Sequence, residues 1–209
     1  FNGKSIDPDN PPTISGGETV TVEGHIINDK GENATTFDGT VSAIIFDSEE
    51  HIVCKLNAGI DTDPFEYDDR TRTLYAGTDS VKAGTFKFTF PVPLDINYSN
   101  LSGLINLYAI NNKKDMEANG TFEDFLIGGT STYEKTDTVG PTIAAFSNGR
   151  NVSEISYTNE TPTLYIELND SSGINTTGNG LGHDIVAIID GNEATTYPHN
   201  SHFTQYIGD

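Results

Sequence analysis

Short segments in which apolar and polar residues alternate are the feature of this sequence that most limits its fold. In the segment 19–26 alternate residues are mostly apolar, and in 86–90 three phenylalanines alternate with Lys87 and Thr89. Such period-two alternation indicates β-strands with one buried face. Apolar residues at helical spacing are nearly absent from the chain. The sequence therefore predicts an all-β protein.

Further strand-like runs follow at close spacing, separated by turns rich in Gly, Asn and Asp, as is typical of β-sandwiches. Together they predict one antiparallel sandwich over residues 1–137. Gly140 and Pro141 disfavour regular structure, and the polar run before them places a domain boundary between residues 137 and 138. The additional runs in this first part are 41–46, 51–56, 73–76, 104–110 and 122–127.

Beyond this boundary, the runs 142–146, 163–168 and 185–190 predict the opening strands of a second, immunoglobulin-like sandwich over residues 138–209. Only about 70 residues remain there, whereas an immunoglobulin-like sandwich has about 100. We therefore expect this domain to be incomplete at its C-terminal end. Its inner-face residues would then lie exposed beside open sheet edges, which favour pairing with another strand or chain. These residues are Leu164, Ile166, Ile185 and Ile189.

A loop rich in Gly and Asn carries the most specific motif of the chain, because residues 173–185 read GINTTGNGLGHDI. This composition indicates a loop of closely specified shape. We expect Asp184, Asn175 and Asn179 to hydrogen-bond backbone groups of the loop, as such side chains routinely do. The residues assigned to this structural loop are Gly173, Asn175, Gly178, Asn179, Gly180, Gly182, His183 and Asp184.

A calcium site is the alternative interpretation of the same loop. Asp170, Asp184 and Asp190 would supply carboxylates, and backbone carbonyl groups would complete the roughly six to eight oxygen ligands that calcium takes. The oxygen chemistry suits the ion, although the spacing is not that of an EF-hand. Zinc is not indicated, because His199 and His202 have no third ligand at a suitable spacing. No other cofactor is expected.

Cys54 is the only cysteine, so the chain has no intrachain disulfide. A peptidase would need a histidine beside this thiol. His51 lies three residues away, and on an extended strand the two side chains point to opposite faces. We therefore interpret Cys54 as a buried structural thiol and predict no catalytic residue in this chain.

The formal charge of −20, from 31 acidic and 11 basic residues, argues against two classes of partner. A nucleic-acid backbone and an anionic membrane surface would both be repelled. No window approaches the roughly 20 apolar residues of a membrane-spanning helix, so we expect no direct membrane span. Because the sequence opens at Phe1 without methionine, we also expect an internal piece of a longer protein.

The motifs of this chain resemble the region that follows the peptidase domain in type IX secretion sortases, which are gingipain-type cysteine peptidases. The loop 173–185 is the specific element of this resemblance, and the strand motifs extend it over nearly the whole chain. These further motifs are TNETPTLY at 158–165, IVAIIDGN at 185–192, VTVEGHI at 20–26, FDGTV at 37–41, GTFKFTFPVP at 84–93 and YA at 108–109.

The resemblance implies a surface-exposed cysteine peptidase and transpeptidase as the parent protein, with its catalytic dyad upstream of these sandwiches. Such a sortase removes the C-terminal sorting domain of exported cargo and joins the new end to anionic lipopolysaccharide. The present chain would be its non-catalytic scaffold and docking region on the extracellular face of the outer membrane. Cargo sorting domains and an outer-membrane barrel protein of the secretion system would be its partners.

Two other classes of function stay open. An independent cell-surface adhesin or glycan-binding module fits the acidic, cysteine-poor composition. The chain has 11 Phe and 9 Tyr, but sequence alone does not separate exposed rings from buried ones, so no sugar site can be named. A self-sufficient hydrolase would require a Cys54 thiol of depressed pKa beside a histidine.

Overall fold

The computed structural model describes residues 1–55, 63–131, 139–148, 159–170, 173–175, 184–194 and 196–206. Its elements are strands and one short 3₁₀ turn, η1 (Asn200–His202), which confirms the predicted all-β class. No described helix is long and apolar enough to cross a membrane. The strands are β1 (Thr13–Gly16), β2 (Thr19–His25), β3 (Gly39–Phe46), β4 (Glu50–Val53), β5 (Glu66–Asp69), β6 (Thr73–Lys82), β7 (Thr85–Pro91), β8 (Leu101–Ser102), β9 (Leu104–Asn111), β10 (Glu117–Phe122), β11 (Leu126–Thr130), β12 (Thr142–Ser147), β13 (Leu164–Asn169), β14 (Val186–Ile188), β15 (Thr196–Pro198) and β16 (Gln205–Tyr206).

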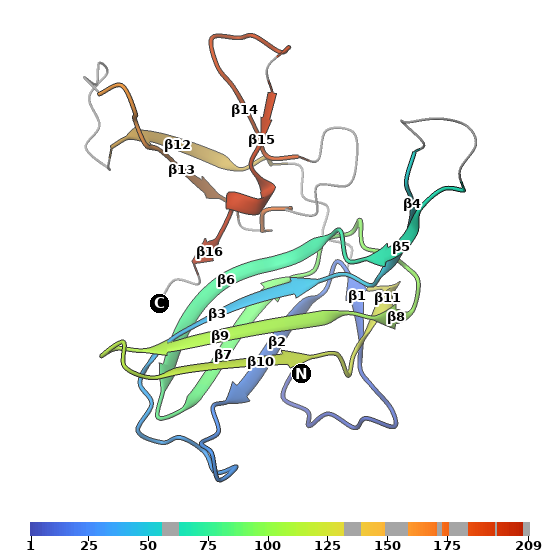
Figure 1. Cartoon of the computed structure of the whole chain (residues 1–209), viewed down its shortest axis with the longest axis vertical. Helices are drawn as coiled ribbons and strands as arrows, with labels where there is room; N and C mark the ends of the chain where they lie inside the picture. The colour runs from blue at the N-terminus through green and yellow to red at the C-terminus, as the bar shows by residue number, and fades with distance from the viewer. Residues whose placement is uncertain are drawn as a thin grey trace. The chain divides into compact units, whose positions relative to one another are not determined.

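The first eleven strands contain an immunoglobulin-like β-sandwich. The largest sheet has the order β10-β9-β3-β6-β7-β2, and Figure 1 shows β10, β9, β3 and β6 side by side. Strands β6 and β7 pair only beside their turn, through Val81–Phe86 and Lys82–Thr85. This short contact lets β7 and β2 separate from β6 and form part of the opposite layer. A smaller sheet has the order β1-β11-β8.

The core lies between the two layers of the sandwich. On β3, alternate residues Val41, Ala43 and Ile45 are buried, and on β7 the phenylalanines predicted to face inward are buried too. The rings of Tyr75 and Phe88 stack with centroids 5.6 Å apart. Because burying one large apolar side chain contributes about 1.5–3 kcal/mol, this cluster makes a large favourable contribution to holding the layers together. It also includes Val20, Val22, Ile105, Ala109, Phe125 and Ile127.

The structure differs from the sequence expectation in strand direction and in strand limits. Strand β1 runs parallel to β11, so the sandwich is not wholly antiparallel. The segment 122–127, expected as one strand, contains the end of β10 and the start of β11. Phe125, between them, is fully buried. Strand β6 continues to Lys82, well beyond the predicted 73–76, because pairing with β3 holds its polar second half in the sheet.

The chain divides into two compact units. One consists of Phe1–Glu134 with Asn175–Asp209, and the other of Lys135–Ile174. In the first unit, β16 pairs with β6 through Gln205–Gly77 and Tyr206–Thr78. The predicted domain boundary between residues 137 and 138 touches residues outside the described ranges. The assignment of two sandwich domains therefore stays a prediction.

The described part of the second unit is centred on an antiparallel pair, β12 with β13. The register places Ile143 opposite Leu168 and Ala145 opposite Ile166. These residues share one face of the pair with Leu164, because side chains alternate along strands. Ile143 is 69% exposed, Leu164 59% and Ile166 42%. The exposure expected for Leu164 and Ile166 is thus present.

Candidate functional site

The structure describes part of the Gly- and Asn-rich loop that the sequence singles out. Gly173 has a φ of 93°, a left-handed conformation that favours glycine, and its N–H donates to the Asp170 carbonyl at 3.3 Å. The Asn175 side-chain amide donates to an Asp95 carboxylate oxygen at 2.9 Å. This bond attaches the loop residue to the segment after β7. The other loop residues, Gly178, Asn179, Gly180, Gly182 and His183, lie outside the described residues.

Asp184 belongs to a set of hydrogen bonds that ties the start of β14 to η1. Its carboxylate accepts from the Asn200 side-chain N–H group at 3.3 Å, and the Asn200 side-chain oxygen Oδ1 accepts from the Ile185 backbone N–H at 2.8 Å. The His199 N–H donates to the Ile185 carbonyl at 2.7 Å. The described partner of the Asp184 carboxylate is thus a side chain of another segment, whereas the sequence analysis expected backbone groups of the loop.

Asp190 lies in the connection between β14 and β15, where the chain turns. It has a φ of 55° and is followed by Gly191 with a φ of 67°. The Asn192 N–H donates to the Ile189 carbonyl at 3.1 Å, which closes this turn. Aspartate and asparagine tolerate left-handed conformations better than most residues. The turn geometry alone therefore explains an aspartate at this position.

The predicted calcium ligands Asp170, Asp184 and Asp190 are all described. Over the described ranges, no group of three or more His, Cys, Asp or Glu side chains is arranged to hold a metal ion. The central loop residues, whose carbonyl groups would complete such a site, lie outside the described residues. Both interpretations of the loop, as a hydrogen-bonded structural element and as a calcium site, stay predictions.

Cys54 lies directly after β4 and is exposed, so the prediction of a buried thiol is wrong. The β4–β5 pair extends by one more bond, from the Cys54 N–H to the Phe65 carbonyl at 2.9 Å. This pair has solvent on both faces, because Tyr67 is 39% exposed on one face and Val53 is 51% exposed on the other. Alternation along the strand therefore carried no information about burial here.

His51 on β4 makes contacts with two carboxylates of β5. Its Nδ1 lies 2.9 Å from Asp68 and its Nε2 lies 3.2 Å from Glu66. Both ring nitrogens can donate only in the protonated imidazolium. Hydrogen bonds to Asp68 and then to Glu66 raise the pKa of His51 above its usual value of 6.5. His51 is thus bound to acidic partners across the hairpin, as an ion-paired side chain.

A buried carboxylate, Asp47, organises one end of the sandwich directly after β3. It is fully buried, and it accepts hydrogen bonds from the backbone N–H groups of Ser48 and Asn97, each at 2.7 Å. Burial raises the pKa of Asp47, against the lowering effect of these bonds and of the Arg72 charge. The carboxylate fixes the β3–β4 connection against the segment after β7, which is a structural function.

Arg70 and Arg72 link the same end of the sandwich to its neighbouring turns. Arg70 donates to the carbonyl groups of Asp47, at 3.1 Å, and Ser102, at 2.6 Å. Arg72 pairs with Glu50 at 2.8 Å. A signal for this cluster is present in the sequence. The chain has only 11 basic residues, and two of them flank Thr71. The sequence analysis missed it.

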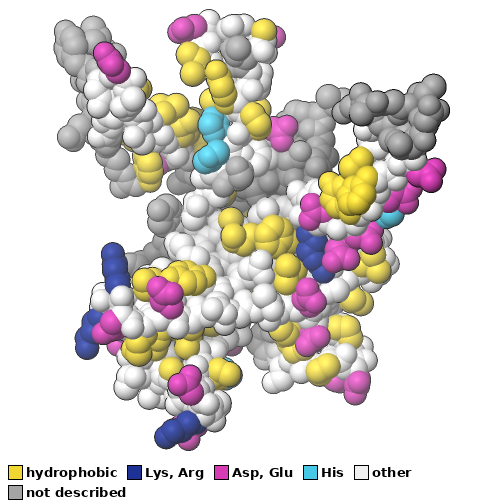
Figure 2. All heavy atoms as spheres, viewed as in Figure 1, with side chains coloured by type: hydrophobic (Ala, Val, Ile, Leu, Met, Phe, Trp, Pro, Cys, Tyr) yellow, Lys and Arg dark blue, Asp and Glu magenta, His cyan; other side chains and the backbone are white. Residues whose placement is uncertain are grey.

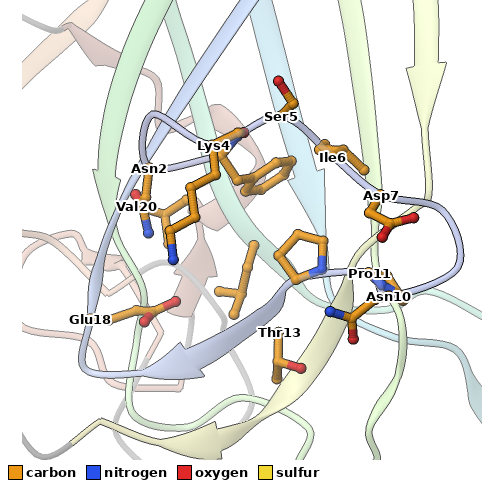
Figure 3. A pocket seen from close by; sticks show the side chains of 13 residues that line it. Asn2, Lys4, Ser5, Ile6, Asp7, Asn10, Pro11, Thr13, Glu18 and Val20 are labelled. Carbon is orange, nitrogen blue, oxygen red and sulfur yellow. The ribbon is translucent and has the colours of Figure 1, made fainter.

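A pocket of about 380 Å³ lies between the first residues of the chain and β1 and β2. Its walls combine apolar residues such as Ile14 and Val20 with polar ones, and Lys4 and Glu18 both line it (Figure 3). Burial raises the pKa of Glu18, although the Ser15 N–H hydrogen bond at 3.0 Å opposes this shift. Phe1 contributes to the wall, so the pocket is built in part by the first residue of the chain.

Comparison with known proteins identifies one part of this architecture. A family model described as the IPT/TIG domain matches residues 4–94, which contain β1 to β7. The IPT/TIG domain is a non-catalytic, immunoglobulin-like domain. A search of curated proteins gives no match. The match agrees with the immunoglobulin-like sandwich that the strands form.

Among solved structures, the chain is similar to the crystal structure of dimeric latent PorU from Porphyromonas gingivalis. The sequence identity is 33% and the TM-score is 0.61. The likeness covers 96% of this chain and 19% of that chain, so the chain spans about a fifth of the neighbour's length. The two comparisons together support a PorU-like region that includes an IPT/TIG domain.

Proposed function

We propose that this chain is a non-catalytic scaffold and docking region of a type IX secretion sortase, exposed at the cell surface. The observation that carries the proposal is the 33% identity to PorU over 96% of this chain. In this proposal the parent protein is a gingipain-type cysteine peptidase and transpeptidase. Its catalytic domain is a separate part of that protein, and this region holds cargo or a partner close to it.

The environment of the one thiol supports the non-catalytic assignment. Cys54 continues a hairpin strand and its backbone N–H bonds to the Phe65 carbonyl. The nearest histidine in sequence, His51, has its two ring nitrogens engaged by Asp68 and Glu66. A thiol nucleophile needs a neighbouring base or cation to form the thiolate. His51 instead makes its hydrogen bonds with the carboxylates of β5.

The β12–β13 pair supports the docking assignment. In the described part of the chain it forms a two-stranded sheet, and one of its faces carries Ile143, Ala145, Leu164, Ile166 and Leu168. Exposed strand edges and an apolar face favour the addition of another strand. The proposed occupant is the β-rich C-terminal sorting domain of a cargo protein, with an outer-membrane barrel protein as the second partner.

Binding of a purified cargo sorting domain to this chain and to the full sortase tests the proposal. Two adjacent alanines provide a matched pair of variants, because both are exposed and they lie on opposite faces of β12. Ala145→Asp places a charge among the apolar residues, whereas Ala144→Asp places it opposite Glu167. We expect Ala145→Asp to weaken binding about tenfold or more, and Ala144→Asp to change it by less than about threefold.

The proposal has two separate points of failure in this experiment. If the full sortase binds the sorting domain and this chain does not, the docking role is wrong. If both variants bind as tightly as the unmodified chain, docking occurs elsewhere than on this face. Near-ultraviolet circular dichroism of both variants provides the check that each keeps its fold.

A further inference from the structure

The face of the β10-β9-β3-β6 layer that points away from the core is an ordered grid of side chains. The strand registers place Asn119, Tyr108, Ser42 and Thr78 side by side in one row across the four strands. The next row toward the other end of the strands is Thr121, Asn106, Ile44 and Ala76. We call these eight residues the outer patch. The residues that alternate with them along the same strands face the other way. Examples are Val41, Ala43, Ile45 and Ala109, which are buried in the core.

The outer patch is accessible, and its centre is an aromatic ring. Tyr108 is 43% exposed and Ile44 is 41% exposed, although both lie on central strands whose other face packs on the core. The structure thus distinguishes exposed aromatic rings from buried ones, which the sequence alone did not. Phe86, Phe88 and Phe90 belong to the core, whereas Tyr108 faces solvent.

The polar groups around Tyr108 have the donor and acceptor capacity of a recognition surface. Asn106 and Asn119 each carry an amide that both donates and accepts, and Ser42, Thr78 and Thr121 carry hydroxyls that do the same. Within the part of the chain that the structure describes, the side chains of Ser42, Asn106 and Asn119 make no hydrogen bond to protein groups. Their hydrogen-bonding capacity is available to a ligand.

Tyr108 also has an acidic neighbour on the adjacent strand, outside the eight patch residues. Glu117, on β10, stands diagonally across from it. Partial desolvation, followed by the hydrogen bond and the charge of Glu117, raises the pKa of Tyr108.

The outer patch is electrically neutral in a strongly acidic chain. The whole sequence carries 31 acidic and 11 basic residues, whereas none of the eight patch residues is charged at neutral pH. Figure 2 shows the centre of this face mainly in white and yellow, with most of the coloured charged side chains nearer its rim. None of the patch residues is a carboxylate, Glu117 lies at the border of the patch beside Tyr108, and an anion would be repelled by this and the surrounding negative charge.

We propose that the outer patch binds a neutral, linear oligosaccharide, with one pyranose ring stacked on Tyr108 and its hydroxyls bonded by Asn106, Asn119 and Ser42. The C–H groups on one face of a pyranose pack against an aromatic ring, and its equatorial hydroxyls bond with amides and hydroxyls at the ring's periphery. Strands about 4.8 Å apart place these groups at spacings similar to the width of a sugar ring. This site goes beyond the proposed docking role and does not depend on it.

The test is a titration of the isotope-labelled chain with neutral hexasaccharides, followed by amide chemical shifts. The probes are cellohexaose, maltohexaose, mannohexaose and xylohexaose, each to about 10 mM, since single-platform sugar sites bind weakly. We expect at least one of them to give saturable shifts centred on Ser42, Asn106, Tyr108 and Asn119. Hexagalacturonate, the anionic comparison, is expected to bind more weakly at low salt.

Three variants separate recognition from folding. Tyr108→Ala removes the platform and is expected to weaken binding about tenfold or more, whereas Tyr108→Phe keeps the ring and should stay within about threefold. Asn119→Ala lies on the exposed edge strand, where truncation does not threaten the core, and should weaken binding severalfold. Tyr67→Ala removes an exposed ring of the β4–β5 pair and should leave binding unchanged.

Four results would overturn the proposal. They are the absence of saturable shifts with every neutral hexasaccharide, shifts that map to Phe65 and Tyr67 instead, undiminished binding by Tyr108→Ala, and tighter binding of hexagalacturonate than of any neutral probe. The first result would show that this face binds none of these sugars. The second would show that the sugar binds at Phe65 and Tyr67 of the β4–β5 pair. The third removes Tyr108 from recognition, and the last assigns the patch to an anion.

Discussion

The sandwich of β1 to β11 and the two C-terminal hairpins, β12–β13 and β14–β15, use the same kind of residue in opposite ways. In the sandwich, Val20, Ile45 and Phe90 have no exposed surface. In the hairpins, Ile143 on β12 is 69% exposed and Ile188 on β14 is 46% exposed. Similar apolar residues on strands are therefore buried in one region and open to solvent in the other.

This difference shows that alternation specifies a strand but not the partner that covers it. The sandwich has two layers, so each apolar face meets another across the core. Each hairpin is a two-stranded sheet within the described residues, and isolated two-stranded pairs are marginal in water. We infer that the sandwich determines the stability of the chain, and that the hairpins gain order from whatever covers them.

The largest expected contrast comes from removing one apolar side chain in each region. Phe90→Ala should lower the free energy of unfolding by about 3–5 kcal/mol, because it leaves a cavity in a fully packed core. Ile166→Ala, on the exposed face of β13, should change it by less than about 0.5 kcal/mol. Urea unfolding followed by circular dichroism measures both, and similar losses for the two variants would refute the contrast.

Two glycines in left-handed conformations compare the regions at the level of the backbone. A Cβ at Gly84 would lie 2.5 Å from the Ala34 carbonyl oxygen, whereas one at Gly191 would meet no atom within 4 Å. Gly84→Ala combines strain with a clash and should destabilise by about 2–4 kcal/mol. Gly191→Ala carries the strain alone and should cost about 1 kcal/mol or less. Thermal melting of the two variants distinguishes these values.

Substitutions of Asp47 measure how much the polar end of the sandwich contributes to the free energy of unfolding. Asp47→Ala leaves the buried N–H groups of Ser48 and Asn97 without their acceptor, and should destabilise by about 1–3 kcal/mol. Asp47→Asn keeps one acceptor and should cost less. Because burial raises the pKa of Asp47 in the folded state, its protonated form favours folding, and that contribution is lost as pH rises above 3.8. The Asn variant should lack this part of the pH dependence.

His51 provides a smaller effect on an exposed hairpin. Its pKa is raised in the folded chain, so the stabilisation from its two acidic partners is fully present below pH 6.5 and is lost as pH rises through the folded pKa. Nuclear magnetic resonance titration of the imidazole protons should give a midpoint above 6.5. Asp68→Asn should lower that midpoint, and an unchanged value would show that the contact is not formed.

Calcium is expected to have the smallest effect. In the described residues, the Asp184 carboxylate accepts a hydrogen bond from Asn200, and Asp190 lies in a turn. We expect the melting temperature of the chain to be the same in calcium and in chelator, for the unmodified chain and for Asp184→Ala alike. A rise with calcium that Asp184→Ala abolishes would instead establish the loop as a metal site.

The sequence predicted most strands of the sandwich because its core residues alternate with polar ones, as in β2, β3 and β7. It did not predict β1, β5, β8 or β10 apart from Phe122, and these strands are short or polar and owe their strand form to a partner. The outer patch could not be predicted from the sequence either, because Asn119, Tyr108 and Ser42 come from three separate segments. Strand register brings these residues together, and no local pattern records register.

Amide hydrogen exchange tests most directly the claim that the sandwich is self-sufficient and the hairpins are not. At neutral pH, amides of β2, β3, β6, β7 and β9 should exchange only through global unfolding, with protection equal to the stability measured in urea. Amides of β12 and β13 should exchange orders of magnitude faster. Equal protection in both regions would show that the hairpin residues are covered by a core of their own, and would contradict this account.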